Sequence, residues 1–385
     1  MRVLYVLSGT DLYGGSTKAF YNLYREVKHM GVEPIVFCTQ KNGIYNVLKD
    51  EGVNVEASDF RFTSWPGYKG ANILLLIPRL LFRIYLHTIA YYKLLRFARY
   101  NKPDIIHSNV SVIDLGYLVA RRLRIKHVWH VREYGLLDFN IHVAPSYAAF
   151  VKRLNDEINH CICITKGIQS YHRLTDSKSS VIYDGVMSKK MIRFNPCKKN
   201  YYLFVGRLEE TKGADVCIDS FKKMIDEIKT NAELWIAGAP IKNEYLDYLK
   251  RKAKGYNILF LGARKDVYDL MYMAKALIVP SKNEGFGLIT AEAMFNGCLV
   301  IGRNTSGTKE QFDNGLSFTG NEIALRFQTD EELTNYLKEV ETVPFTKYEK
   351  MILRGQTVVS SLYSSETHAN KVVSLYNSIL YGSKK

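Results

Sequence analysis

The sequence predicts an α/β protein made of two Rossmann-like, doubly wound domains. Short apolar runs rich in β-branched residues alternate with longer stretches of helical period, a pattern typical of βαβ units in parallel sheets. This alternation continues to about residue 195 and then starts again. A chain of 385 residues also has the length of two ordinary domains. The simplest assembly places the two domains face to face across a cleft.

Strands are expected wherever a short apolar run is bounded by turn residues. In the first half these runs are Val3–Leu7, Pro34–Cys38, Asp104–His107, His127–His130, His160–Ile164 and Ser180–Tyr183. In the second half they are Tyr201–Val205, Glu233–Ala237, Asn257–Leu261, Ala276–Val279 and Leu299–Ile301. The segments between them show helical spacing of apolar residues, so each sheet is expected to be parallel.

A polar segment containing a proline, residues 193–200, marks the expected domain boundary. We therefore predict a first domain of residues 1–195 and a second of residues 196–360. The remaining segment, residues 361–385, is expected to form a final helix.

Cysteine usage and the start of the chain predict a cytoplasmic protein. The six cysteines form neither a C-x-x-C pair nor a Cys/His cluster with zinc spacing, so free thiols in a reducing compartment are expected. The first residues form a strand pattern that runs into a glycine turn, unlike a signal peptide.

The net charge of +15 is concentrated in the first half, where residues 1–195 hold 27 Lys and Arg against 15 Asp and Glu. Such an excess suits an anionic partner. Nucleic acid is disfavoured, because no recognised nucleic-acid-binding module accompanies the charge.

Residues 73–100 contain a very apolar stretch whose length alone would suit a membrane span. Four basic residues on one side of the expected helix make a spanning position costly. Two main interpretations stay open for this helix: burial against the sheet, or contact with an anionic membrane surface on the inner face of the plasma membrane. A partner protein is a third. The four residues are Arg79, Arg83, His87 and Lys93.

The strongest motif, Pro280–Met294, directly follows an expected strand. Gly285 and Gly287 permit a tight turn, and a helix is expected from Leu288 onward. A helix N-terminus after a glycine turn offers backbone N–H groups to a phosphate. Glu284 and Glu292 are placed to accept hydrogen bonds from sugar hydroxyls on either side of a diphosphate. An ordinary strand–turn–helix is the alternative.

A second loop, Val205–Gly213, also follows a strand and precedes a helix. Arg207 and Lys212 would extend from it at the carboxyl edge of the sheet, where open α/β sheets bind ligands. Arginine binds a diphosphate in bidentate fashion and lysine acts as a point charge. A solvated basic loop is the alternative.

Together these loops resemble those of the family 4 glycosyltransferases, which have the GT-B fold, and the resemblance covers most of the chain. It implies a retaining enzyme in which Arg207 and Lys212 neutralise the donor diphosphate. It also implies that Glu292 binds the ribose and Glu284 the donor sugar. Further donor-binding residues implied by the resemblance are Gly15, Gly206, Arg264, Phe286, Gly287, Leu288 and Ile289.

In the first domain, Gly14 and Gly15 follow the first strand and open a helix. The resemblance implies a phosphate or acceptor contact at this glycine pair, although such turns are common. It also implies that His107, at the end of a strand, lies near the cleft. A purely structural histidine is an equal alternative.

The segment His130-Val131-Arg132-Glu133 resembles a form found in some capsule and polysaccharide transferases. The resemblance implies that His130 approaches the sugar hydroxyls. It further implies that Arg132 approaches the phosphate or acceptor, and that Glu133 orients the histidine. A helix cap with a surface ion pair is the alternative.

No D-x-D triplet occurs in the sequence, so neither a metal nor another cofactor is expected. The predicted function is transfer of a sugar, with retention, from a UDP- or GDP-sugar to a glycan or lipid-linked acceptor in cell-surface polysaccharide assembly. The first domain would bind the acceptor, and the last helix would cross back to it, as the resemblance implies. A nucleotide-sugar epimerase and a non-catalytic partner subunit are the alternatives.

Overall fold

The computed structural model describes residues 1–12, 14–66 and 75–382, and the chain divides into two compact units. Unit 1 contains residues 1–185 together with the C-terminal segment from Ser365, and unit 2 contains Val186–Ser364. The division between Gly185 and Val186 lies earlier than the boundary expected near residue 195. The final helix, α15 (Ser365–Tyr381), is part of unit 1.

Unit 1 is built on a seven-stranded parallel sheet in the order β3-β2-β1-β4-β5-β6-β7. The register places Leu4 of β1 beside Ile35 of β2 on one side and Ile106 of β4 on the other. These strands are apolar along their length because both faces of the sheet are covered by helices. The strands are β1 (Arg2–Val6), β2 (Glu33–Cys38), β3 (Val55–Ala57), β4 (Ile105–Ser108), β5 (Lys126–Val131), β6 (Asn159–Cys163) and β7 (Ser179–Val181).

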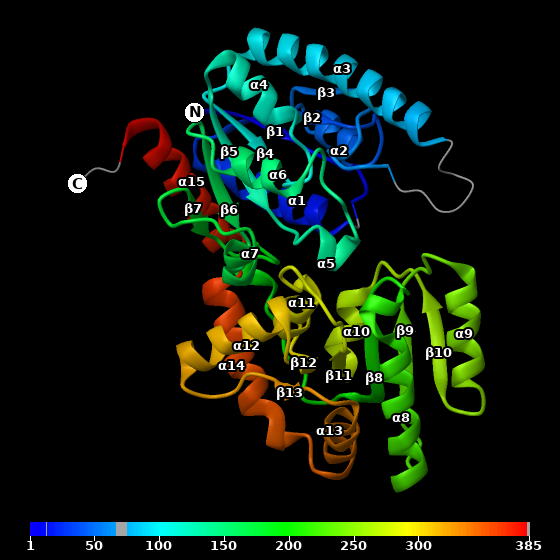
Figure 1. The fold of residues 1–385 in the computed structure, drawn as a ribbon. Coiled ribbons are helices and arrows are strands. Elements are labelled where there is room, and N and C mark those ends of the chain that lie inside the picture. The colour runs from blue at the N-terminus through cyan, green and yellow to red at the C-terminus, as the bar shows by residue number, and fades with distance from the viewer. Residues whose placement is uncertain (13, 67–74, 383–385) are drawn as a thin grey trace. The chain divides into compact units, whose positions relative to one another are not determined.

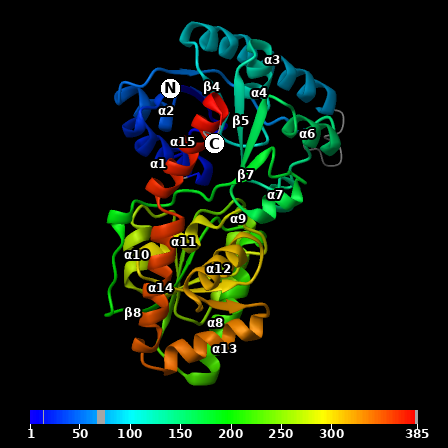
Figure 2. The same ribbon diagram turned by 90° about the vertical axis from the view of Figure 1, so that its left-hand side faces the viewer.

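The helices of unit 1 form two layers. Alternate residues of β1 point to opposite faces, so Val3 and Tyr5 pack with α1, α2 and α15, whereas Leu4 and Val6 pack with α3 and α4. Figure 2 shows α15 (red) beside α1 (blue), far apart in sequence but in contact. The helices are α1 (Gly15–Val27), α2 (Ile44–Asp50), α3 (Leu76–Asn101), α4 (Leu115–Leu123), α5 (Leu136–Phe139), α6 (Tyr147–Leu154) and α7 (Lys166–Tyr171).

Unit 2 repeats this architecture with a six-stranded parallel sheet in the order β10-β9-β8-β11-β12-β13 (Figure 1). Its strands are β8 (Lys199–Val205), β9 (Glu233–Ala237), β10 (Ile258–Gly262), β11 (Ala274–Val279), β12 (Leu299–Arg303) and β13 (Leu325–Phe327). Its helices are α8 (Ala214–Ile228), α9 (Asn243–Ala253), α10 (Val267–Met273), α11 (Leu288–Phe295), α12 (Ser306–Thr319), α13 (Asp330–Thr342) and α14 (Thr346–Leu362). Helices α8, α9, α13 and α14 enclose one apolar core against the sheet.

The expected parallel α/β architecture is confirmed in both units, and every strand expected from sequence is present. Two further strands, β3 and β13, were missed. Each has three residues and lies at an edge of its sheet, so neither carries a long apolar run. Their place is set by pairing with β2 and β12.

Helix α3 is buried only along its second half. Ala90, Leu94 and Ala98 are buried in the core of unit 1, whereas Ile77, Leu81, Phe82, Ile84 and Tyr85 are exposed. Residues 73 and 74 of the segment expected to form this helix lie outside the described residues. Within residues 1–12, 14–66 and 75–382, no helix has both the length and the apolarity needed to cross a bilayer.

Candidate functional site

In unit 2 the two predicted loops follow neighbouring strands at the point where the strand order reverses. The chain moves outward from β8 to β9 and β10 on one side, then returns to β11 on the other. Ligands of open parallel sheets bind outside the carboxyl ends of the strands at such a point. The loop with Arg207 follows β8, and the loop with Glu284 follows β11.

The two loops are in direct contact. The backbone N–H of Lys282 donates to the carbonyl of Thr211 at 3.0 Å. Gly213 has φ of +74°, and a Cβ at this position would lie 2.8 Å from the carbonyl oxygen of Pro280. Only glycine fits this conformation and this approach without strain. The glycine that ends the first loop therefore lets the second lie against it.

Lys212 and Glu284 form an ion pair across this contact, with Nζ and Oε1 2.7 Å apart. Their side chains are 20% and 15% exposed. Arg207 is more exposed and lies 2.8 Å from Glu209 on its own loop. The structure thus brings the predicted lysine and glutamate together, beside the loop that carries the arginine.

The second loop continues into α11 through Gly287, which has φ of +86° and caps the helix. The amide of Gln311 donates to the carbonyls of Phe286 and Gly287, at 2.6 and 3.0 Å. These bonds fix the carbonyls of the turn, while a helix start leaves its first N–H groups available to an anion. Glu292 is buried one turn beyond Leu288 in α11.

Arg264 lies on neither of these two loops. It follows β10, the edge strand that lies two positions from β8, and its guanidinium forms two hydrogen bonds with Asp266. Both side chains are exposed. Its predicted role at the base of the donor stays a prediction.

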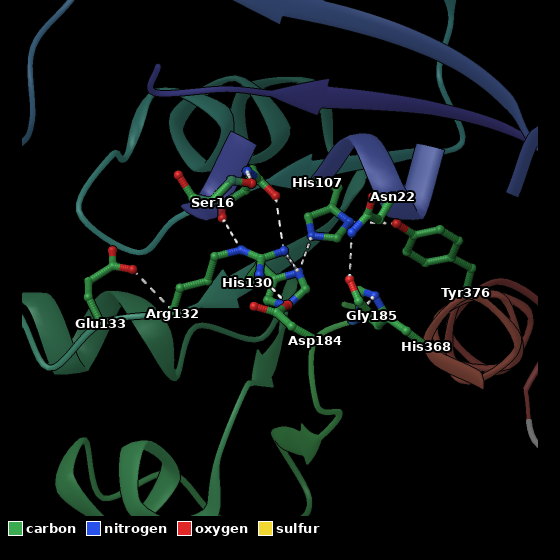
Figure 3. Close-up of polar contacts among 11 residues, drawn as sticks. Ser16, Asn22, His107, His130, Arg132, Glu133, Asp184, Gly185, His368 and Tyr376 are labelled. Atoms are coloured by element: carbon green, nitrogen blue, oxygen red, sulfur yellow. Dashed lines mark hydrogen bonds and ion pairs between the residues drawn. The ribbon is translucent and has the colours of Figure 1, made fainter. Parts of the chain in front are cut away.

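Unit 1 contains a buried polar network at the carboxyl ends of β4 and β5 (Figure 3). Nε2 of His107 lies 3.2 Å from Nδ1 of His130, and Nδ1 of His107 lies 2.5 Å from the hydroxyl of Tyr376 on α15. Burial, followed by the charge of Arg132, lowers the pKa of both histidines well below its usual value. Both rings are therefore neutral at neutral pH.

Arg132 is buried within this network and does not extend toward solvent. Its Nε donates to the carbonyl of Asn109 at 2.9 Å, and its Nη1 forms an ion pair with Asp184. Its Nη2 lies 3.2 Å from Nδ1 of His130. These three contacts, all within unit 1, occupy N–H groups of the guanidinium. The expected contact of Arg132 with a phosphate or acceptor therefore stays a prediction.

Glu133 does not contact His130, contrary to the role expected for it. Its Oε1 accepts hydrogen bonds from the N–H of Ser111 at 2.8 Å, the hydroxyl of Ser111 at 2.9 Å and the N–H of Val112 at 3.1 Å. The side chain of residue 133 points away from that of residue 130, and its carboxylate holds the loop after β4. Burial raises the pKa of Glu133 to about 7.

Of the glycine pair, Gly14 lines a pocket in unit 1, whereas Gly15 is not among the lining residues and its predicted contact with the donor stays a prediction. Gly14 and Ser16 line this cavity of about 480 Å³ at the carboxyl end of β1. Asn109, which also binds Arg132, donates from Nδ2 to the carbonyl of Ser16 at 3.0 Å. The structure therefore links the start of α1 to the histidine network through one asparagine.

Two family models match the chain. The model described as "Glycosyltransferase Family 4" matches residues 13–189, and the model described as "Glycosyl transferases group 1" matches residues 189–358. The two models together cover residues 13–358. The chain belongs to the family 4 glycosyltransferases. The expected GT-B fold is supported by the crystal structure of the Anabaena protein HepE in complex with UDP and glucose. That structure has a TM-score of 0.77 at 16% identity and covers 98% of this chain and 100% of its own.

The curated relatives of this glycosyltransferase align with it over a shorter part of the chain than the Anabaena structure does. An uncharacterized glycosyltransferase of Methanocaldococcus jannaschii is 28% identical over 56% of this chain and 60% of its own length. The Campylobacter jejuni enzyme named "GalNAc-alpha-(1->4)-GalNAc-alpha-(1->3)-diNAcBac-PP-undecaprenol alpha-1,4-N-acetyl-D-galactosaminyltransferase" is 27% identical over 43% of this chain and 51% of its own length. The matched segments thus span little more than half of these relatives.

His130, Asp184 and His368 of the glycosyltransferase bring three ligand-type atoms within 4.8 Å of one another. Their hydrogen bonds do not suit a cation. Nδ1 of His368 accepts from the N–H of Gly185, and Nδ1 of His130 accepts from Arg132, so both neutral rings carry their proton on Nε2. A protonated ring nitrogen donates a hydrogen bond and cannot bind a metal.

Several residues of this network were missed by sequence reasoning. Asn109, Asp184, His368 and Tyr376 were not among the predicted site residues, and none of them lies in one of the motifs described above. Their roles depend on contacts between distant segments, such as the 269 positions that separate His107 from Tyr376. No local pattern in the sequence carries that signal.

Proposed function

We propose that this glycosyltransferase transfers a sugar, with retention of configuration, from a UDP- or GDP-sugar to a glycan acceptor. Unit 2 would bind the donor through Arg207, Lys212, Glu284 and Glu292, and unit 1 would bind the acceptor. No metal or other cofactor takes part in the proposed reaction.

The ion pair between Lys212 and Glu284 carries this proposal. It joins a cation suited to a diphosphate and a carboxylate suited to sugar hydroxyls, at the carboxyl edge of a parallel sheet. The leaving nucleoside diphosphate gains negative charge as the glycosidic bond breaks. Preorganised positive groups and helix N–H groups stabilise such charge, and one donor is worth about 3 kcal/mol.

The acceptor is proposed to be a lipid-linked glycan of cell-surface polysaccharide assembly, at the cytoplasmic face of a membrane. The Campylobacter jejuni relative is named for an undecaprenol-linked glycan, and the Anabaena structure contains UDP and glucose. These names support the donor class and the acceptor class. Neither identifies the sugar that this chain transfers.

Donor binding can be tested by thermal shift with a panel of UDP- and GDP-sugars. We expect one donor to raise the Tm of the wild type, and Glu292→Ala and Arg207→Ala to abolish the rise. The matched controls Glu339→Ala and Arg251→Ala remove the same side chains from helices of unit 2 outside the two loops. An unchanged rise in both site variants would contradict the proposed site.

The epimerase alternative receives no support from the relatives, because the Campylobacter jejuni enzyme is named as a transferase. An epimerised nucleotide sugar formed without free nucleotide would be needed to restore it.

We also propose that unit 1 contacts an anionic membrane surface through the first half of α3. Its exposed apolar residues adjoin a cavity of about 310 Å³ that three arginines line with Phe82. Guanidinium groups bind phosphates and exposed apolar side chains enter the headgroup region, so both features suit anionic lipid. The three arginines are Arg61, Arg79 and Arg83.

Vesicle sedimentation tests this contact. We expect the protein to bind phosphatidylglycerol vesicles more tightly than phosphatidylcholine vesicles, and the double variant Arg79→Glu, Arg83→Glu to lose that preference. The double variant Arg121→Glu, Arg122→Glu makes the same change of charge on the exposed side of α4. Equal losses in both double variants would show a general charge effect and overturn the proposed surface.

A further inference from the structure

A continuous chain of buried side chains leads from the core of unit 1 to His130. The hydroxyl of Tyr5 lies 3.3 Å from that of Tyr376, which lies 2.5 Å from Nδ1 of His107. Nε2 of His107 lies 3.2 Å from Nδ1 of His130. Figure 3 shows Tyr376 extending from α15 toward His107, with His130 beyond it.

The position of each proton in this chain follows from Arg132. A guanidinium only donates hydrogen bonds, so Nδ1 of His130 accepts from Nη2 of Arg132. The same Nδ1 faces Nε2 of His107, and two lone pairs facing each other would repel. Nε2 of His107 therefore carries a proton, and its Nδ1 accepts a hydrogen bond from the hydroxyl of Tyr376. The single hydroxyl proton of Tyr376 can reach either this nitrogen, at 2.5 Å, or the hydroxyl oxygen of Tyr5, at 3.3 Å, and the much shorter contact takes it.

The opposite end of His130 is thereby fixed as a donor. With Nδ1 accepting, the neutral ring carries its proton on Nε2. This Nε2 is buried and has no hydrogen-bond partner among the described residues, and Oδ1 of Asp184 lies 3.6 Å from it. A buried N–H without a partner costs free energy unless a ligand atom accepts its hydrogen bond.

We infer that His107 and Tyr376 are positioning residues that hold His130 in the tautomer with Nε2–H, so that His130 donates a hydrogen bond to a substrate oxygen. The inference rests on the proposed transferase function and adds to it a role for two residues. His130 then acts as a neutral donor and not as a general base, because its only free nitrogen is already protonated. Helix α15 reaches the site through Tyr376.

Steady-state kinetics test the positioning role with Tyr376→Phe, which removes one hydroxyl and keeps the ring. We expect kcat to fall about 10-fold while KM for the donor changes less than about twofold. Tyr24→Phe is the matched control, because the Tyr24 hydroxyl is likewise in unit 1 and donates to Glu51 at 2.7 Å, outside this chain. It should keep the wild-type kcat.

A second pair of variants guards against a folding defect. His107→Gln retains an amide N–H that can reach His130, whereas His107→Leu cannot donate. We expect the glutamine variant to keep most of kcat and the leucine variant to lose about 10-fold, at similar Tm. Equal losses in the two variants would overturn the role of His107.

The tautomers can be read directly by two-bond ¹H–¹⁵N spectra of histidine-labelled protein. The expected spectrum shows His107 and His130 both protonated on Nε2, with His107 shifting toward a mixture of tautomers in Tyr376→Phe but not in Tyr24→Phe. A wild-type His130 protonated on Nδ1 would refute the inference. This readout needs no substrate, so it separates a failure of the positioning role from a failure of the proposed function.

Discussion

At the scale of single residues, the two candidate sites differ in how their charges are held. Lys212 and Glu284 are partly exposed and neutralise each other, so a bound diphosphate can compete for the lysine. Arg132 and Asp184 are buried and are held by additional hydrogen bonds. Breaking the first pair should affect ligand binding, whereas breaking the second leaves a buried charge unpaired and should destabilise the fold.

Replacing Lys212 by Ala is expected to reduce kcat/KM for the donor about 100-fold, because one cation is lost from the leaving diphosphate. The free energy of unfolding should change by less than about 1 kcal/mol, since surface ion pairs contribute little. Donor kinetics and urea unfolding measure the two effects. Lys309→Ala, which breaks an exposed pair with Asp313, should leave both unchanged. A kcat/KM for Lys212→Ala close to the wild type would exclude a role in the donor site.

Glu133 should make the stability of unit 1 depend on pH. Burial raises its pKa from 4.5 to about 7, so the folded state binds a proton more tightly than the unfolded state. Its contribution to stability is then complete below pH 4.5 and is lost as the pH rises through 7. We expect the free energy of unfolding to decrease by up to about 3 kcal/mol across this window.

Urea unfolding at a series of pH values measures this dependence, with Glu133→Gln as the comparison. The glutamine variant cannot ionise, so its curve should be flatter over the same window. Parallel curves for the two proteins would assign the dependence to other groups.

At the scale of elements, the turn before α11 is shaped by the helix that follows it in unit 2. The N–H of Gly307, at the start of α12, donates to the carbonyl of Glu284 at 2.9 Å. Gln311, one turn later, binds the carbonyls of Phe286 and Gly287. Helix α12 therefore holds the loop whose glutamate contacts Lys212, although it carries none of the residues predicted from the motif.

Gly307→Ala tests this support. A Cβ at position 307 would lie 2.6 Å from the carbonyl oxygen of Phe286, so either α12 or the turn must shift. We expect a loss of about 1–3 kcal/mol in unfolding free energy, together with a weaker donor-dependent thermal shift. Gly355→Ala in α14 is the control, because the atom nearest to its added Cβ would be Cγ of Met294, 3.4 Å away. If Gly307→Ala matched that control, the turn would not depend on α12.

At the scale of the whole molecule, the proposed chemistry relies on side chains and backbone amides in place of a metal. The sequence contains no D-x-D triplet, and the hydrogen bonds of His130 and His368 do not suit a cation. Treatment with EDTA is therefore expected to leave the rate of sugar transfer within about twofold of the untreated rate. A loss of activity in the folded protein that Mg²⁺ restores would contradict this expectation.

Much of the fold was already determined by the sequence. Alternating apolar periods predicted two parallel sheets, and glycines at the ends of strands predicted the loops of unit 2. These signals are local, since a period or a turn depends on residues a few positions apart. The loops with Arg207 and Glu284 could be placed at one sheet edge for the same reason, because both follow strands whose carboxyl ends share that edge.

Only the tertiary structure decided which polar groups meet in unit 1. From sequence, Glu133 was the expected partner of His130, yet its carboxylate holds the loop after β4 while His107, Arg132 and Tyr376 determine the state of the histidine. A hydrogen bond requires atoms about 3 Å apart, and sequence spacing predicts such proximity only within one element or turn. The tyrosine arrives on a helix from the opposite end of the chain, so its place depends on packing of the complete unit.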